Sequence, residues 1–313
     1  MARDPQDDVA AALLTQWLDH VRVHAVADLP LAAAQQRYPV VILEPGLGPL
    51  LTDYTVLAED LASHGYVVIG STPTYSASVV VFADGHVTQS TAAGNVPDAA
   101  SLAETQQILG RLITVWVGDV TFLLDQAATL NRADASHRFT DRLDLQHIGV
   151  MDHSFGGATA AEVCASDVRC TAGIDLDGYL YGDVVQRGLT RPFMFVWSEP
   201  PDPSDAGWQL NSRESQAIYS TLPHGSYQLM IKGARHFNFS DYAVLYAPVV
   251  KLSDGLGSID GRRGLLITTT MSTPSLTSIS SSNPPTCSTV HRQTFPKSTS
   301  MYARPTSPMK RVQ

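Results

Sequence analysis

One serine of this sequence, Ser154, has the neighbours that covalent chemistry requires. It lies in the segment Gly149–Gly157, GVMDHSFGG, where an apolar run meets a serine that two glycines follow closely. This pattern is typical of a nucleophile elbow, in which a strand ends, the chain turns sharply to expose the serine, and a helix begins. It predicts that the Ser154 hydroxyl attacks the carbonyl carbon of an ester. One position departs from the usual pattern, because Asp152 stands where glycine is expected.

A serine hydroxyl is a poor nucleophile unless a base takes its proton and a third group orients that base. In α/β-hydrolases these groups follow the serine in the order acid, then histidine. Asp177 comes directly after an apolar run, with Asp175 as its competitor, and His236 follows the last apolar run. His224 lies in a Pro-His-Gly turn and fits the pattern less well. We therefore predict Ser154 as nucleophile, Asp177 as acid and His236 as base.

The reaction also needs two backbone N–H groups that stabilise the oxyanion of the tetrahedral intermediate. One donor is expected from the residue after the nucleophile, Phe155. The other is expected from the loop after an early strand, and Gly46-Leu47-Gly48 fits that place. We predict the N–H groups of Leu47 and Phe155 as the oxyanion hole.

The apolar pattern around these residues predicts an α/β protein with a parallel sheet. Tyr38–Leu43 is a short apolar run, typical of a buried parallel strand, and Glu44–Pro49 follows it as a loop. Tyr54–His64 has helical periodicity and stops at Gly65, and Tyr66–Gly70 is the next strand. Further expected elements are a hairpin or excursion loop at 79–87, one or two helices at 101–130, strands at 144–151, 172–176, 193–197 and 227–231, and helices at 155–165 and 213–221.

Length and charge narrow the function further. The chain has 313 residues, of which 44% are hydrophobic and 16% charged, enough for one large domain with a sizeable core. The net charge of −9 and the lack of a basic stripe argue against nucleic-acid binding. We find no run of about 18 apolar residues and expect no spanning helix. Residues 1–8 carry no apolar signal region. The compartment stays open: secreted if the start is truncated, otherwise cytoplasmic.

Two of the three cysteines, Cys164 and Cys170, are six positions apart. They form either a disulfide or two free buried thiols, and the sequence favours neither. No metal site is expected, because the chain has no C-x-x-C motif.

The ends of the chain differ in composition from its middle. Val9–Val23 is expected to be an amphipathic helix or a partly ordered arm, within an N-terminal region of residues 1–37. The catalytic domain is expected at residues 38–267. From residue 268 to 313, serine, threonine and proline dominate, and no Asp or Glu follows Asp260. Such a segment buries little apolar surface, and we predict a disordered tail.

Several of these segments together resemble the platelet-activating factor acetylhydrolase family of the plasma, or isoform II, type, and its fungal members most of all. The segments that carry the resemblance are Pro-Gly-Leu-Gly at 45–48, DLASHGYVV at 60–68, HSFGGAT at 153–159, GIDLDG at 173–178 and HFNFSD at 236–241. They run from about Tyr38 to Ile267. The resemblance implies an α/β-hydrolase fold, a mostly parallel central sheet with helices on both faces, and calcium-independent removal of a short acyl group from phospholipid-like esters. It implies no cofactor. The family's nucleophile, acid and base fall on Ser154, Asp177 and His236, and its oxyanion donors on Leu47 and Phe155.

The sequence departs from this family in two places. Asp152 is expected to add steric strain and, if buried without a partner, a desolvation cost. We therefore expect the Asp152→Gly variant to turn over esters faster. In the tail, another reading frame of the bases behind Thr269–Ser282 can spell an amphipathic helix of the family's kind. This leads to the hypothesis that residues 268–313 are a frameshift or mis-spliced product, which the coding DNA would test.

Three functions remain open at this point. The first is a short-acyl phospholipid esterase, the second a broader carboxylesterase or polyester hydrolase, and the third a hydrolase-like scaffold with impaired activity. The apolar stretches Val79–Phe82 and Tyr179–Tyr181 line an acyl or lipid contact, or serve ordinary packing. The expected partner is a small-molecule or lipid ester, with peripheral contact to a lipid surface.

Overall fold

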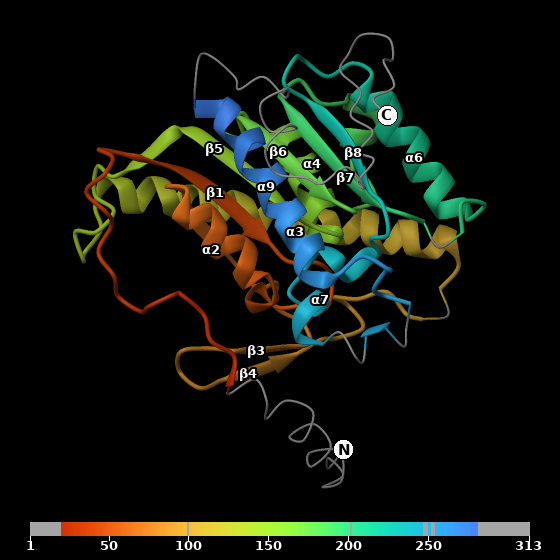
Figure 1. The fold of residues 1–313 in the computed structure, drawn as a ribbon, viewed down its shortest axis with the longest axis horizontal. Coiled ribbons are helices and arrows are strands. Elements are labelled where there is room, and N and C mark those ends of the chain that lie inside the picture. Colours follow the sequence, from red (N-terminus) through yellow and green to blue (C-terminus); the bar gives the residue numbers. More distant parts are fainter. Residues whose placement is uncertain (1–19, 99, 201, 247–249, 252–253, 281–313) are drawn as a thin grey trace, which may run out of the picture. The chain divides into compact units, whose positions relative to one another are not determined.

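A parallel sheet of six strands lies at the centre of residues 31–313 in this computed structural model (Figure 1). The structure describes residues 20–98, 100–200, 202–246, 250–251 and 254–280. Residues 1–30 form a separate unit, and its described part, 20–30, is mostly irregular. The greater part of the predicted helix at residues 9–23 therefore lies outside the described residues.

The strand order is β2-β1-β5-β6-β7-β8, and every neighbouring pair is parallel. A separate antiparallel hairpin, β3 with β4, turns at Asp84-Gly85 and confirms the hairpin alternative. The strands are β1 (Tyr38–Glu44), β2 (Val67–Gly70), β3 (Val79–Val81), β4 (Val87–Gln89), β5 (Leu143–His153), β6 (Ala172–Leu176), β7 (Phe193–Ser198) and β8 (Tyr227–Ile231).

Helices cover both faces of the sheet, as predicted. Alternate residues of β1 separate two cores: Ile42 packs with α3 and α4 on one face, whereas Val41 and Leu43 pack with α2 and α9 on the other. The helices are α2 (Thr55–Ser63), α3 (Leu102–Arg132), α4 (Phe155–Ser166), α5 (Val184–Arg187), α6 (Ala206–Tyr219), α7 (Tyr242–Leu245) and α9 (Gly261–Ser280), with 3₁₀ helices at Leu51–Tyr54 and His236–Phe239.

Helix α3 is the longest helix and begins at a capping box. The Ser101 hydroxyl accepts a hydrogen bond from the N–H of Glu104, and the Glu104 carboxylate accepts one from the N–H of Ser101. By length and composition, it is the one described helix that qualifies as a membrane span, although the sequence predicted none. A core helix of a globular domain passes the same test, and Trp116, Val120 and Leu124 of α3 are buried.

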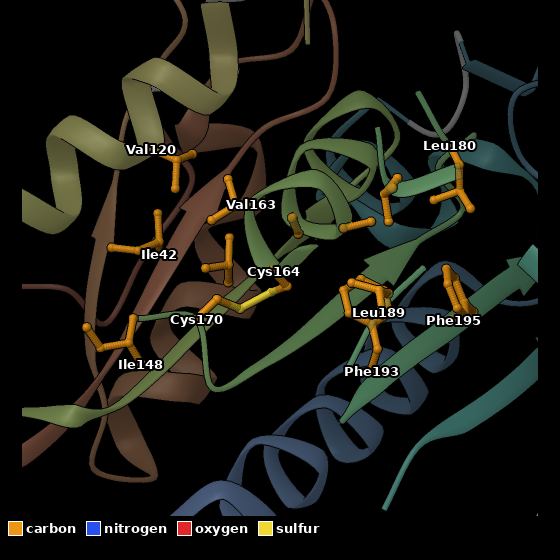
Figure 2. Close-up of a cluster of buried hydrophobic side chains, with 14 of the residues drawn as sticks. Ile42, Val120, Ile148, Val163, Cys164, Cys170, Leu180, Leu189, Phe193 and Phe195 are labelled. Carbon is orange, nitrogen blue, oxygen red and sulfur yellow. A yellow bond between two sulfur atoms is a disulfide. The ribbon is translucent and has the colours of Figure 1, made fainter. Parts of the chain in front are cut away.

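Cys164 and Cys170 form a disulfide within the core on the α4 face (Figure 2). The bond joins α4 to the segment that leads into β6. Both cysteines are almost fully buried, among side chains such as Val163, Ile148 and Phe193. Of the two alternatives that the spacing left open, the structure has the disulfide.

The structure differs from the expected tail boundary. Residues 268–280 continue α9, which packs against α2 and the sheet, so the expected disorder from residue 268 is wrong for this part. The physical reason is that serine and threonine hydroxyls of α9 bond to carbonyls one turn earlier: Thr268 to Gly264 and Ser272 to Thr268. Leu276 then reaches the core on the α2 face. Residues 281–313 lie outside the described part of the chain.

Helix α6 also begins earlier than predicted. The apolar periodicity indicated a start at Arg213, but the helix begins at Ala206. Asp205 explains the difference, because its carboxylate accepts a hydrogen bond from the N–H of Trp208 and caps the helix. The early start places Trp208 at the site described next.

Candidate active site

The predicted nucleophile sits on a sharp turn between β5 and α4. Ser154 has φ 60° and ψ −126°, a strained conformation for a residue other than glycine. Two glycines allow the turn to pack tightly. A Cβ on Gly156 would lie 2.1 Å from the carbonyl oxygen of Glu44, and one on Gly157 would lie 2.1 Å from Oδ1 of Asp175. The HSFGG pattern therefore encodes a serine held out from the sheet by its own backbone.

The structure brings the three predicted reactive side chains into one hydrogen-bonded chain. Nε2 of His236 lies 3.0 Å from Oγ of Ser154, and its Nδ1 lies 2.8 Å from Oδ2 of Asp177. His236 begins the 3₁₀ helix after β8, and Asp177 follows β6. Because the strands are parallel, their carboxyl ends meet at one edge of the sheet, and the three residues meet there. Asp177 orients Nδ1–H, which leaves Nε2 to accept the serine proton.

Asp177 is held as a carboxylate by the donors around it. Its Oδ1 accepts a hydrogen bond of 2.7 Å from the N–H of Ser198, and its Oδ2 accepts one of 2.9 Å from the Ser198 hydroxyl. Burial by itself raises the pKa of Asp177, but the hydrogen bond and charge of His236 and the Ser198 N–H outweigh it, so the pKa is lowered. This environment favours the ionised form that supports a histidine base.

The competitor Asp175 points elsewhere. Its Oδ1 accepts a hydrogen bond of 2.7 Å from the N–H of Gly178, beneath the start of α4. Burial raises the pKa of Asp175 well above its usual range, and the nearby charge of Asp177 raises it further. The turn at Asp177, where φ is 60°, separates the directions of the two carboxyl groups. Of the two aspartates, Asp177 is the one that contacts His236.

The expected oxyanion loop passes close to the nucleophile. A Cβ on Gly46 would lie 3.1 Å from Cβ of Ser154, a tighter contact than most side chains make, so a larger residue would require a small shift of the loop or the elbow. Leu47 and Phe155 both line the same pocket as Ser154 and His236. Phe155 is the first residue of α4, and its N–H therefore has no helical acceptor.

A pocket of about 360 Å³ opens above these groups, and aromatic side chains form much of its wall. Arg235 and Asp254 are its charged residues besides the reactive ones. A second pocket of about 220 Å³ shares Trp197 and Trp208 with it and is otherwise lined by uncharged residues. The aromatic residues of the first pocket are Phe155, Tyr179, Tyr181, Trp197 and Trp208. The predicted acyl contact at Tyr179–Tyr181 thus faces this pocket, whereas Val79–Phe82 does not line it.

Beneath the elbow, three acidic side chains stand in register on neighbouring strands: Glu44 of β1, Asp152 of β5 and Asp175 of β6. We call them the buried carboxyl row. Each is at most 1% exposed, and each has one carboxyl oxygen without a hydrogen-bond partner among the described residues. Burial is the main cause that raises their pKa values, to about 8 for Glu44 and well above the usual range for the other two.

Asp152 therefore has the unpartnered, desolvated oxygen that the sequence led us to expect. The backbone at Asp152 has no positive φ, which in this segment belongs to Ser154. One oxygen, Oδ1, accepts a hydrogen bond of 2.6 Å from the N–H of His153. The structure therefore shows the desolvation cost of Asp152.

Sequence reasoning missed three residues of the site. Ser198 supplies two donors to Asp177, and its only signal was its place at the end of a strand next to that of the acid. Tyr54 and His153 lie beneath the Gly46–Gly48 loop and His236. They are hydrogen-bonded to each other, with 2.9 Å between the Tyr54 hydroxyl oxygen and Nδ1 of His153. His224 does not line the pocket. Among the described residues, no group of three or more His, Cys, Asp or Glu side chains has the arrangement of a metal site.

Comparisons with known proteins identify the family of this chain. A family model described as Platelet-activating factor acetylhydrolase, isoform II, matches residues 6–93 and 99–280. A protein of Arthroderma benhamiae, named Probable 1-alkyl-2-acetylglycerophosphocholine esterase, is 28% identical over 231 residues, covering 71% of this chain and 54% of that protein. The Platelet-activating factor acetylhydrolase of Cavia porcellus is 24% identical over 257 residues, covering 76% and 56%. This chain thus spans about half the length of the curated relatives it matches.

A solved structure, the ferulic acid esterase from Streptomyces cinnamoneus, superposes with a TM-score of 0.70 at 25% identity, covering 92% of this chain and 84% of that one. Together with the parallel sheet and the elbow, this likeness establishes an α/β-hydrolase fold. The family match reaches beyond the expected region of residues 38–267 at both ends. Because that match covers far more than half of its length, the chain belongs to the platelet-activating factor acetylhydrolase, isoform II, family.

Proposed function

We propose that this protein is a serine ester hydrolase that removes a short acyl group from phospholipid-like esters through an acyl-enzyme. The observation that carries the proposal is the hydrogen-bonded chain from Ser154 through His236 to Asp177, open to an aromatic pocket. The names of the Arthroderma benhamiae and Cavia porcellus relatives support the substrate class.

In the first half of the proposed reaction, Oγ of Ser154 forms a bond to the ester carbonyl carbon as its proton passes to Nε2 of His236. The charge that develops on the carbonyl oxygen is stabilised by the N–H groups of Leu47 and Phe155. Asp177 stabilises the imidazolium and keeps its orientation. The bond to the alcohol then breaks, and the alcohol leaves with the proton from His236.

In the second half, water attacks the acyl group on Ser154 and gives its proton to His236. The collapse of the second tetrahedral intermediate returns that proton to Ser154 and releases the carboxylic acid. Groups of the chain supply every proton transfer in these steps, so the proposal includes no cofactor.

A broader carboxylesterase or polyester hydrolase is the second candidate. It is favoured by the aromatic wall of the pocket and by the structural likeness to a ferulic acid esterase. Hydrolysis rates for acetyl, butyryl and octanoyl p-nitrophenyl esters, followed by an acetylated phospholipid, separate the two functions. The short-acyl phospholipid esterase predicts a steep fall with chain length and a preference for the phospholipid. A flat profile favours the broader esterase.

The hairpin β3–β4 is the proposed place of peripheral lipid contact. Val81, Phe82 and Val87 are exposed on it, and the hairpin is joined to the oxyanion loop, because the N–H of Ser78 bonds to the carbonyl of Gly48. Val81→Ser is expected to slow hydrolysis of micellar substrate and leave monomeric substrate unaffected. Val168→Ser is the matched control, since Val168 is equally exposed but follows α4 at the opposite edge of the sheet.

Labelling with a fluorophosphonate probe tests the proposed nucleophile. The probe is expected to modify the wild-type protein and the Ser63→Ala variant, in which an exposed serine at the end of α2 is removed. It is expected not to modify Ser154→Ala. If the folded wild-type protein takes no label, the third alternative, a scaffold with impaired activity, replaces the proposal.

A further inference from the structure

A buried tyrosine joins the oxyanion loop to the nucleophile elbow. Tyr54 is fully buried at the end of the 3₁₀ helix before α2. Its hydroxyl oxygen lies 3.1 Å from the N of Gly46 and 2.9 Å from Nδ1 of His153. Gly46 precedes Leu47, and His153 precedes Ser154. One hydroxyl group therefore contacts the residue before an oxyanion donor and the residue before the nucleophile.

The hydrogen-bond directions at this hydroxyl follow from a count of protons. The N–H of Gly46 donates to the phenol oxygen, so the single phenol proton remains for Nδ1 of His153. His153 is then the tautomer with its proton on Nε2. This tautomer leaves only Nε2–H without a partner among the described residues, whereas the opposite tautomer would leave both the phenol proton and the Nε2 lone pair without partners, which costs more in a buried site. Burial lowers the pKa of His153 well below its usual range, and the neighbouring His236 lowers it further, so the ring is neutral.

The His153 ring packs against the imidazole ring of His236, the proposed base. The ring centroids of His153 and His236 are 4.4 Å apart, and Phe237 and Phe239 enclose the same ring at 6.2 and 5.9 Å. A shift or rotation of His153 therefore moves His236 relative to Ser154. Close packing also limits the loop, because a Cβ at Gly46 would lie 3.3 Å from the Tyr54 oxygen.

We propose that Tyr54 and His153 are positioning residues of the reaction: the Tyr54 hydroxyl holds the Gly46–Leu47 loop backbone and the His153 tautomer together, and so aligns the oxyanion hole with the nucleophile and base. The inference rests on the proposed ester hydrolysis. Neither side chain lines the substrate pocket. We therefore expect this pair to affect the transition state rather than the binding of substrate.

Tyr54→Phe removes only this hydroxyl and is the direct test. Tyr38→Phe is a matched control, because the buried Tyr38 hydroxyl also accepts a backbone N–H, from Gln35, and donates to a carbonyl, of Ala32. Tyr38 lies at the opposite end of β1 from the site. With p-nitrophenyl acetate, Tyr54→Phe is expected to lower kcat about tenfold with KM within about twofold of the wild-type value. The rate of fluorophosphonate labelling is expected to fall in parallel. Tyr38→Phe is expected to lower the melting temperature without either change.

If Tyr54→Phe fails to fold, a second pair of variants decides. His153→Asn keeps an acceptor near the position of Nδ1, whereas His153→Leu keeps bulk alone. The inference predicts that His153→Asn retains at least fivefold more kcat than His153→Leu at equal KM. Equal kcat in these two variants, or equal kcat in Tyr54→Phe and Tyr38→Phe, overturns it. A wild-type protein that neither hydrolyses the ester nor takes the label defeats the proposed function instead.

Discussion

Asp177 and the buried carboxyl row stand at the carboxyl ends of neighbouring parallel strands and have opposite tendencies to ionise. Asp177, beside His236, accepts hydrogen bonds on both oxygens, and its pKa is lowered although burial acts to raise it. The buried carboxyl row under the elbow has one unpartnered oxygen on each member, and its pKa values are raised. Desolvation raises the pKa in both cases, so the hydrogen-bond donors and the charge of His236 decide which carboxyl group keeps its charge.

The contrast is sharpest between Asp175 and Asp177, which are two residues apart on one strand end. Sequence alone offers both as acids for a histidine. In the structure Asp175 is fully buried, whereas 12% of the Asp177 side chain stays exposed, at the pocket. The turn after β6 directs one carboxyl group to Ser198 and His236 and the other beneath α4. A charged carboxylate that orients a base and a neutral carboxyl group in a core thus arise from the same residue type.

The largest expected effect comes from removing the charge at Asp177. Asp177→Asn is expected to lower kcat/KM about 10⁴-fold, because an amide neither fixes the His236 tautomer nor stabilises the imidazolium. Asp175→Asn is the matched change and is expected to cost less than tenfold, since its amide oxygen still accepts the N–H of Gly178. Steady-state kinetics with p-nitrophenyl acetate measures both. Similar losses of kcat/KM in the two variants would contradict the assignment of Asp177, rather than Asp175, as the acid that orients His236.

The second effect concerns the stability of the fold and tests whether Glu44, a member of the buried carboxyl row, is protonated. Burial raises the pKa of Glu44 from 4.5 to about 8, so the folded state holds a proton that the unfolded state releases. Wild-type stability is therefore expected to fall as the pH rises from about 4.5 to about 8. Glu44→Gln removes the contribution of Glu44 to this dependence, and at pH 9 the variant is expected to be more stable by on the order of 5 kcal/mol.

Urea unfolding at pH 5 and pH 9 makes this comparison. The difference between Glu44→Gln and wild type is expected to be small at pH 5 and to grow toward pH 9. A gap that is constant with pH would show that Glu44 is ionised throughout. The Ser71 hydroxyl, which donates to Glu44 Oε1, keeps its acceptor in the variant and so does not confound the result.

A smaller effect is expected when Asp177 loses one of its donors. Ser198→Ala removes the hydroxyl bond to Oδ2 and keeps the N–H bond to Oδ1. The pKa of Asp177 then rises and its hold on His236 weakens, so kcat/KM is expected to fall about tenfold, in line with the loss of one charge-assisted hydrogen bond. Ser204→Ala is a control, because that hydroxyl bonds to the exposed Asp202 outside the pocket. Unchanged kinetics in Ser198→Ala would mean that the backbone N–H suffices.

These residues also indicate what sequence can and cannot predict. The sequence was enough to predict Ser154, Asp177 and His236, because their order along the chain and their positions at the ends of apolar runs can both be read from it. It was not enough for Ser198 and Tyr54, because their roles depend on which strands become neighbours and on a loop that folds back over the elbow. The helical segment after residue 267 was missed for another reason: composition counts hydroxyl groups as polar, whereas in α9 they bond to the helix's own carbonyls.

The smallest expected effect belongs to Asp152, the position where the sequence leaves its family's pattern. Burial and the charge of Glu44 both raise its pKa, which favours the neutral carboxyl group, and in that form it hinders the reaction little. When it ionises, its negative charge lies near Tyr54, whose pKa it raises, and opposes the oxyanion forming on the adjoining loop. Asp152→Gly is therefore expected to raise turnover about twofold near pH 7 and more at pH 9.

Asp152→Asn separates the two possible causes, since it removes the charge and keeps the bulk of the side chain. Equal gains in both variants identify charge as the cause, and a gain in Asp152→Gly alone identifies packing. Initial rates from pH 6 to pH 9 measure this, and turnover that stays level or drops in Asp152→Gly across that range would mean that the buried carboxyl group costs the reaction nothing.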